Sequence, residues 1–101
     1  MTDAQDTIDL PVFGLTLERV TLQHARARYA IRKNAVEINV SRSDVWGGGE
    51  AWLVRAVVNR GGGRIVLEYY TLAHDLGTAC AALLAEMTPD DVAAIRALGE
   101  P

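Results

Sequence analysis

The sequence predicts an α+β domain, with an antiparallel meander of four to five strands and two C-terminal helices packed on one face. Two observations lead to this prediction. Between turn-forming breaks, residues 15–72 show either period-two alternation or segments dense in β-branched and aromatic side chains, and residues 73–99 change to a helical period. Strands that precede helices, rather than alternate with them, are typical of this class. We expect residues 10–101 to form the domain and residues 1–9, with three aspartates, to be an acidic flexible arm.

The first part of the domain, residues 15–30, is open to two interpretations. Alternation over 15–22 favours a strand, whereas a helix from Thr16 to Tyr29 would also bring several apolar side chains together. Residues 25–32 alternate with period two, Lys33-Asn34 suits a two-residue turn, and alternation resumes from Val36 to Ser41. These residues therefore predict a hairpin.

Two Gly-Gly-Gly runs interrupt the middle of the chain. The run at 61–63 separates residues 51–59 from 64–72, both dense in β-branched and aromatic side chains, and predicts a second hairpin. The run at 47–49 is expected to lie in a longer loop beside Trp46, after turn-forming residues at 41–44. Neither run has the Gly-Lys-Ser/Thr ending or the helix that phosphate binding requires.

The C-terminal third predicts two helices. An apolar stripe recurs at Leu76, Cys80, Leu83 and Met87, which indicates a helix over 73–87. Thr88-Pro89-Asp90-Asp91 then supplies a capping hydroxyl, a proline suited to the first turn, and acids at the positive end of the dipole. Val92, Ile95 and Leu98 form the buried stripe of this second helix, and Gly99 ends it.

The alternation assigns strand residues to two faces of the sheet. The face predicted to be covered by the helices holds Tyr29, Ile31, Val36, Ile38, Val40, Trp52, Val54, Val58, Leu67 and Tyr69. The opposite face is predicted to hold Arg26, Arg28, Arg32, Glu37, Asn39, Ser41 and Arg55.

Composition argues against several classes of function. Cys80 is the sole cysteine, so disulfide frameworks and cysteine-based zinc sites are excluded, and we expect no metal and no cofactor. The acidic start and the lack of a long apolar run predict a cytoplasmic protein without membrane contact. The residues available for catalysis, His24, His74, Ser41, Ser43 and Cys80, follow no catalytic spacing. We therefore expect no enzyme activity.

Charge is strongly polarised along the chain. Residues 1–18 carry a net −4, residues 19–64 carry +6, and residues 65–101 carry −5. Arginines on an exposed sheet face can hold carboxylates or phosphates bidentately, unless Glu37 and Glu68 neutralise them across the strands. The candidate partner-binding residues are Arg26, Arg28, Arg32, Lys33, Arg55 and, as an exposed aromatic contact, Trp46.

These features predict a small non-catalytic protein-interaction module: an inhibitor, an antitoxin or immunity-like protein, or an assembly factor. We expect it to be encoded by a bacterial, phage or mobile-element gene. It would act through a basic sheet face and an acidic helical end. The same polarity allows two copies to dock as a homodimer. The alternative is a nucleic-acid-binding protein that uses the arginine face, although the RNP pattern of single-strand readers and regular aromatic interleaving are both missing.

Overall fold

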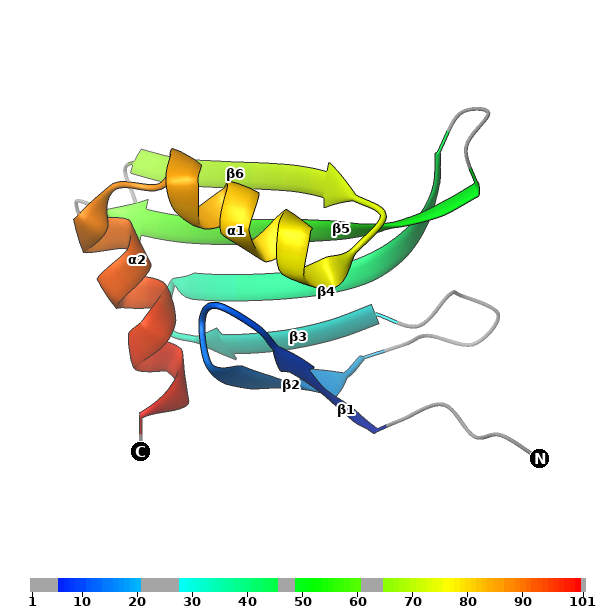
Figure 1. Cartoon of the computed structure of the whole chain (residues 1–101). Coiled ribbons are helices and arrows are strands. Elements are labelled where there is room, and N and C mark those ends of the chain that lie inside the picture. The colour runs from blue at the N-terminus through cyan, green and yellow to red at the C-terminus, as the bar shows by residue number, and fades with distance from the viewer. Residues whose placement is uncertain (1–5, 21–27, 46–48, 61–64, 101) are drawn as a thin grey trace.

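The fold is a six-stranded antiparallel meander with two helices on one face (Figure 1). The computed structural model describes residues 6–20, 28–45, 49–60 and 65–100. Its strands lie side by side in chain order as β1 (Thr7–Leu10), β2 (Leu15–Arg19), β3 (Arg28–Lys33), β4 (Val36–Val45), β5 (Gly49–Arg60) and β6 (Ile65–Ala73). They are followed by α1 (Leu76–Glu86), α2 (Pro89–Arg96) and a short 3₁₀ turn (Ala97–Gly99). The predicted fold class is confirmed.

The sheet has six strands, which corrects the predicted four to five. The added strand is β1, which residues 7–10 form by pairing with β2 from Thr7 opposite Glu18 to Leu10 opposite Leu15. Most of β1 comes from the segment predicted to be an acidic arm. The sequence gives little indication of this strand, because only Ile8 and Leu10 face the core. Aspartates lie beside them in the sequence. A turn in which Val12 and Gly14 take positive φ returns the chain, and the Gly14 N–H donates to the Leu10 carbonyl at 3.2 Å.

Residues 15–19 form a strand, so the helix considered from Thr16 is wrong for this stretch. Leu15 and Leu17 are buried, while Glu18 pairs opposite Ala30 of β3. Burial of these two leucines against the helices stabilises the strand, since period two brings both side chains to the core face. Residues 21–27, which include His24 and Arg26, lie outside the described residues.

The β4–β5 hairpin is longer than predicted. Residues 41–44 were expected to form a turn, but β4 continues to Val45, which pairs opposite Gly49. Cross-strand pairing therefore overrides the turn preference of the serines and Asp44. Gly49 takes a φ of 81°, which glycine adopts without strain. This end of the hairpin extends beyond the helices in Figure 1, and Trp46 lies outside the described residues.

The core lies between the sheet and the two helices. Of the ten strand residues predicted to be covered, five are buried: Tyr29, Ile38, Val40, Val54 and Val58. Four are half-buried and pack against the core: Ile31, Val36, Trp52 and Tyr69. Leu67 is partly exposed near the sheet edge. Trp52 was expected in the core but is only half-buried, because it lies near the end of the hairpin that extends beyond the helices. There the Arg42 guanidinium lies 4.5 Å from the centroid of its ring.

Both helices begin at side-chain caps. Asp75 accepts a hydrogen bond from the Thr78 N–H at 2.9 Å, so α1 starts at Leu76, three residues later than predicted, because β6 continues to Ala73. Thr88 accepts from the Asp91 N–H at 3.3 Å and Pro89 occupies the first turn, which confirms the predicted start of α2. Cys80, Leu83, Ile95 and Leu98 are buried against the sheet as their stripes predict.

A buried polar contact joins α2 to β6. The Tyr69 hydroxyl donates to Asp91 Oδ2 at 2.5 Å, and Asp91 is only 1% exposed. A buried carboxylate is tolerated when donors satisfy it, so this contact both stabilises Asp91 and aligns the second helix with the last strand. The Asp91 side chain is therefore turned inward and adds little to an acidic helical end.

Tyr69→Phe should lower the free energy of unfolding by about 1–3 kcal/mol, because the buried carboxylate loses a donor. The matched control is Tyr70→Phe on the next residue, whose hydroxyl is exposed and lies 3.3 Å from Glu68. Urea unfolding of both variants measures the difference. Equal stability of the two variants would contradict a stabilising role for the Tyr69–Asp91 contact.

Candidate interaction surface

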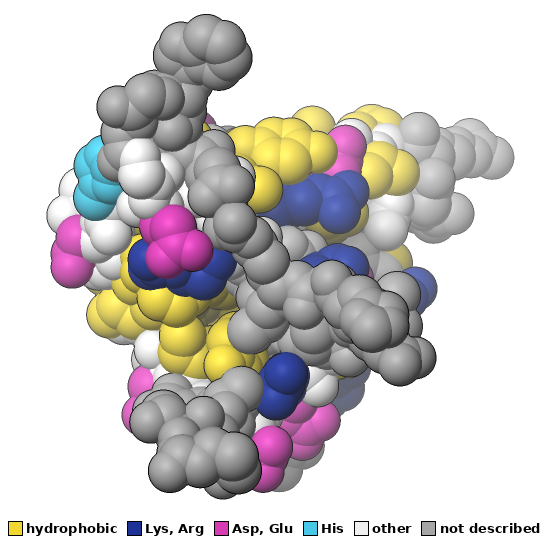
Figure 2. All heavy atoms as spheres, turned by 90° about the vertical axis from the view of Figure 1, so that its right-hand side faces the viewer, with side chains coloured by type: hydrophobic (Ala, Val, Ile, Leu, Met, Phe, Trp, Pro, Cys, Tyr) yellow, Lys and Arg dark blue, Asp and Glu magenta, His cyan; other side chains and the backbone are white. Residues whose placement is uncertain are grey.

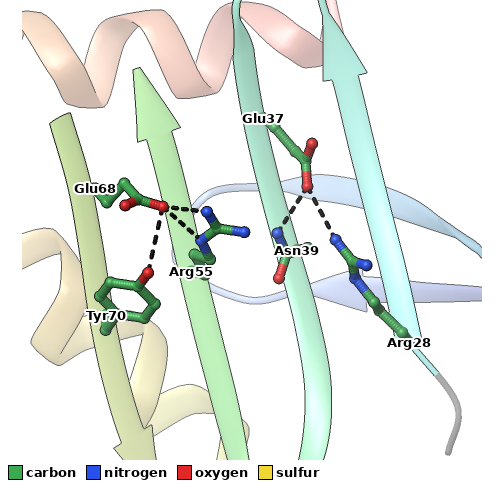
Figure 3. Close-up of polar contacts among 6 residues, drawn as sticks. All are labelled: Arg28, Glu37, Asn39, Arg55, Glu68 and Tyr70. Carbon is green, nitrogen blue, oxygen red and sulfur yellow. Dashed lines mark hydrogen bonds and ion pairs between the residues drawn. The ribbon is translucent and has the colours of Figure 1, made fainter. Parts of the chain in front are cut away.

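One face of the sheet is left uncovered by the helices, and we call it the open face. Strand register places its residues in three rows that run from β3 to β6. Arg28, Ser41, Leu53 and Leu72 form the first row, Ala30, Asn39, Arg55 and Tyr70 the second, and Arg32, Glu37, Val57 and Glu68 the third. In Figure 3 the labelled side chains of this face stand in front of the sheet and the helices lie behind it.

Arg55 and Glu68 form an ion pair in the part of the open face nearest β6 (Figure 3). The Arg55 Nε donates to Glu68 Oε1 at 3.0 Å and its Nη2 donates to the same oxygen, while Tyr70 Oη lies 3.3 Å away. The Arg55 guanidinium also lies 5.7 Å from the Tyr70 ring centroid, within the range of a cation–π contact. The three side chains therefore hold one another in place.

The two charges of this pair shift each other's proton affinity. The hydrogen bond from Arg55 lowers the pKa of the Glu68 carboxyl below its ordinary value, and the hydrogen bond to Glu68 raises the pKa of Arg55. Both groups are partly exposed, with 35% of the Arg55 side chain and 37% of the Glu68 side chain accessible. Solvent therefore screens the pair, and its contribution to stability is small.

A second polar cluster spans β3 and β4. Glu37 accepts a hydrogen bond from the Asn39 amide at 2.7 Å and forms an ion pair with Arg28 at 3.3 Å (Figure 3). Asn39 is 6% exposed, and its row places it between Ala30 and Arg55. The carboxylates of Glu37 and Glu68 thus neutralise two of the arginines predicted to form a basic surface.

The remaining predicted binding residues are dispersed. Arg32 lies on the open face, is exposed, and makes no ion pair with any residue that the structure describes. Lys33 lies on the helix side instead, because it follows Arg32 on an alternating strand. There it lines a hollow of about 330 Å³ together with Val36, Leu98 and Glu100. The structure therefore separates Lys33 from the arginines, and Arg26 and Trp46 lie outside the described residues.

The open face also has an apolar part, which is not among the predicted binding residues. Val66, Tyr70 and Leu72 of β6 are 55%, 51% and 51% exposed, and the rows place Val57 and Leu53 beside Glu68 and Leu72. Figure 2 shows hydrophobic side chains around basic and acidic ones at its upper right. The sequence does indicate this apolar part, because successive strand residues point to opposite faces. With Leu67 and Tyr69 on the covered face, their neighbours Val66 and Tyr70 must lie on the open face.

Two of the groups considered for catalysis, Cys80 and His74, lie in structural surroundings. Burial raises the pKa of the Cys80 thiol to about 11, which keeps it protonated at neutral pH. His74 Nδ1 lies 2.9 Å from the Glu50 carbonyl oxygen, in a contact between β5 and the end of β6. Within the described ranges, no group of three His, Cys, Asp or Glu side chains is placed to hold a metal ion. No helix in the same ranges is long and apolar enough to cross a membrane.

Comparisons of the chain with protein-family models, with curated proteins and with solved structures find no match.

Glu68→Gln should reduce stability at neutral pH and have a diminishing effect as the solution becomes acidic. The lowered pKa means that the carboxylate stabilises the fold above its ordinary pKa and loses that contribution as pH falls through the folded-state value. The control is Glu86→Gln, an exposed residue with no ion pair among the described residues. Thermal unfolding across the acid range provides the measurement. A difference in thermal stability between the parent and Glu68→Gln that does not change with pH would contradict a lowered pKa of Glu68 in the folded protein.

Proposed function

We propose that this chain is a small non-catalytic protein-interaction module that binds another protein through the open face of its sheet. The observation that carries the proposal is the composition of that face. Exposed Val66, Tyr70 and Leu72 adjoin the Arg55–Glu68 pair, and Arg28 and Arg32 lie on the far side of the same rows. Interfaces in general combine apolar and aromatic contacts with arginine and a polar rim.

The pairing of the arginines modifies the predicted mode of binding. Net positive charge is reduced where Glu37 and Glu68 contact Arg28 and Arg55, and Asp91 is turned into the core. Attraction between a basic sheet and an acidic helical end is therefore weaker support than the mixed apolar and polar surface. The same pairing lowers the charge available for phosphates, so nucleic-acid binding has less support than protein binding.

The test compares partner capture by the parent and by Arg28→Ser/Arg32→Ser, which alters the open face away from β6. Two exposed charges contribute roughly 0–1 kcal/mol each, so folding should be retained. The matched control is Lys33→Ser/Glu86→Ser, two exposed residues off the open face. We expect one specific protein to be captured by the parent and the control, and several-fold less by the double arginine variant.

Two outcomes would overturn the proposal. Equal capture by parent and double arginine variant would show that this part of the open face does not bind. A salt-dependent gel shift with nucleic acid, abolished by the arginine variant and insensitive to sequence, would favour the nucleic-acid alternative.

A further inference from the structure

We propose that a second copy of this chain pairs with β6 edge to edge, in antiparallel register, to form a dimer with a continuous sheet. This inference goes beyond the proposed function, because it uses the edge of the sheet next to the open face. In the described part of the chain, β6 pairs with β5 on one side and with no strand on the other, and Figure 1 places it at the outer edge of the sheet. Its outward backbone N–H and C=O groups are therefore available to another strand.

β6 lacks the features that commonly prevent edge pairing. It has nine residues without proline, glycine or lysine, and its single charged side chain, Glu68, is paired with Arg55. The other edge differs, since β1 has four residues and carries Asp9, which accepts a hydrogen bond from Thr16 at 3.0 Å. The long apolar edge is thus the one suited to pairing.

The register follows from self-complementarity about Tyr69, the central residue of β6. A two-fold axis there pairs all nine residues of the strand, so that Ile65 lies opposite Ala73 of the second copy and Ala73 lies opposite Ile65 of the second copy. Val66 then lies opposite Leu72, and Glu68 opposite Tyr70, twice each by symmetry. Open-face residues meet open-face residues, as the pleat requires.

The neighbouring registers are less favourable. An axis at Glu68 would place two carboxylates directly opposite each other, which is destabilising. An axis at Tyr70 would place Glu68 opposite Leu72 and leave the carboxylate without a phenol across the strands. Of these three registers, the one centred on Tyr69 places Tyr70 of the second copy opposite Glu68 and Leu72 of the second copy opposite Val66. Avoiding opposed carboxylates and pairing apolar side chains therefore favour the register centred on Tyr69 over its two neighbours.

The paired sheets extend the rows of the open face across the dimer. Arg55 and Tyr70 of one copy would continue to Glu68 of the other, and Leu53 and Leu72 would continue to Val66. Two apolar clusters would then flank a polar centre of Arg, Tyr and Glu. Each copy contributes Leu53 and Leu72 to one cluster and Val66 to the other, so the two clusters are equivalent by symmetry, as an isologous interface requires.

The first experiment measures the mass of the purified chain by sedimentation over a range of concentrations. We expect a monomer–dimer equilibrium, and a dissociation constant raised roughly tenfold or more in Val66→Lys/Leu72→Lys, because lysines would then oppose lysines in both pairs. Val20→Lys is the control, since Val20 is 48% exposed and directly follows β2, which is far from β6 in sheet order. It should leave the equilibrium unchanged. A parent that stays monomeric, or a lysine pair variant that dimerises as tightly, would overturn the inference.

The second experiment tests the register with single cysteine variants and a short thiol cross-linker. Val66→Cys mixed with Leu72→Cys should yield a cross-linked dimer, and each variant alone should yield much less. Equal cross-linking in all three samples would contradict the axis at Tyr69.

The two proposals fail separately. A monomeric parent that still captures another protein through Arg28 and Arg32 would reject the dimer and retain the interaction module. A dimer formed through β6 with no capture of another protein would reject the wider proposal and retain the dimer.

Discussion

The rest of the molecule depends on one constraint: the two helices cover only one face of the six-stranded sheet. α1 lies over β5 and β6, α2 packs on β4 and β5 near one end of the sheet, and the 3₁₀ turn packs on β2 and β3 (Figure 1). The buried side chains lie between the helices and the sheet. Every strand must therefore place apolar residues at alternate positions to keep its core side chains on the helix side. The open face is the direct consequence, and its side chains must be compatible with water.

The open face meets this requirement by pairing its charges internally. Glu37 and Glu68 lie among arginines and receive hydrogen bonds from Asn39 and Arg55, so the middle of the face is polar and locally neutral. Towards β6 the composition changes to Val66, Tyr70 and Leu72, which are half exposed. A graded surface of this kind favours contact with another protein over contact with phosphates, because apolar area and neutralised charge both favour burial. The dimer proposed here would bring Val66 of each copy into contact with Leu72 of the other at this apolar end.

Much of this arrangement could be predicted from residues alone. Period-two alternation assigned Ile38, Val54 and the arginines to their faces, and Thr88-Pro89 located the second helix, because these signals are local. What could not be predicted depends on tertiary context. β1 has too few residues to show a period, and β4 extends through residues with turn preference because β5 pairs with them. The sequence predicts Lys33 as a binding residue together with the arginines. Because it directly follows Arg32 on an alternating strand, it lies opposite Val36 on the helix side of the sheet.

The site was predicted less fully than the fold. Charge drew attention to the arginines, but ion pairing across strands depends on register, which composition does not contain. The buried Tyr69–Asp91 contact was missed for the same reason, since Asp91 also suits a helix N-terminus by sequence. The exposed apolar residues of β6 were implied by the parity of Leu67 and Tyr69, yet hydrophobic residues on a strand are ordinarily assigned to a core.

Amide hydrogen exchange of residues 65–73, measured at increasing protein concentration, tests the edge pairing of β6 most directly. In an antiparallel edge strand alternate amides point outward and exchange with solvent unless another strand accepts their hydrogen bonds. We expect protection of β6 to rise with concentration, while that of β1, the opposite edge, stays constant. Protection of β6 that is independent of concentration across the range would contradict a second copy at this edge.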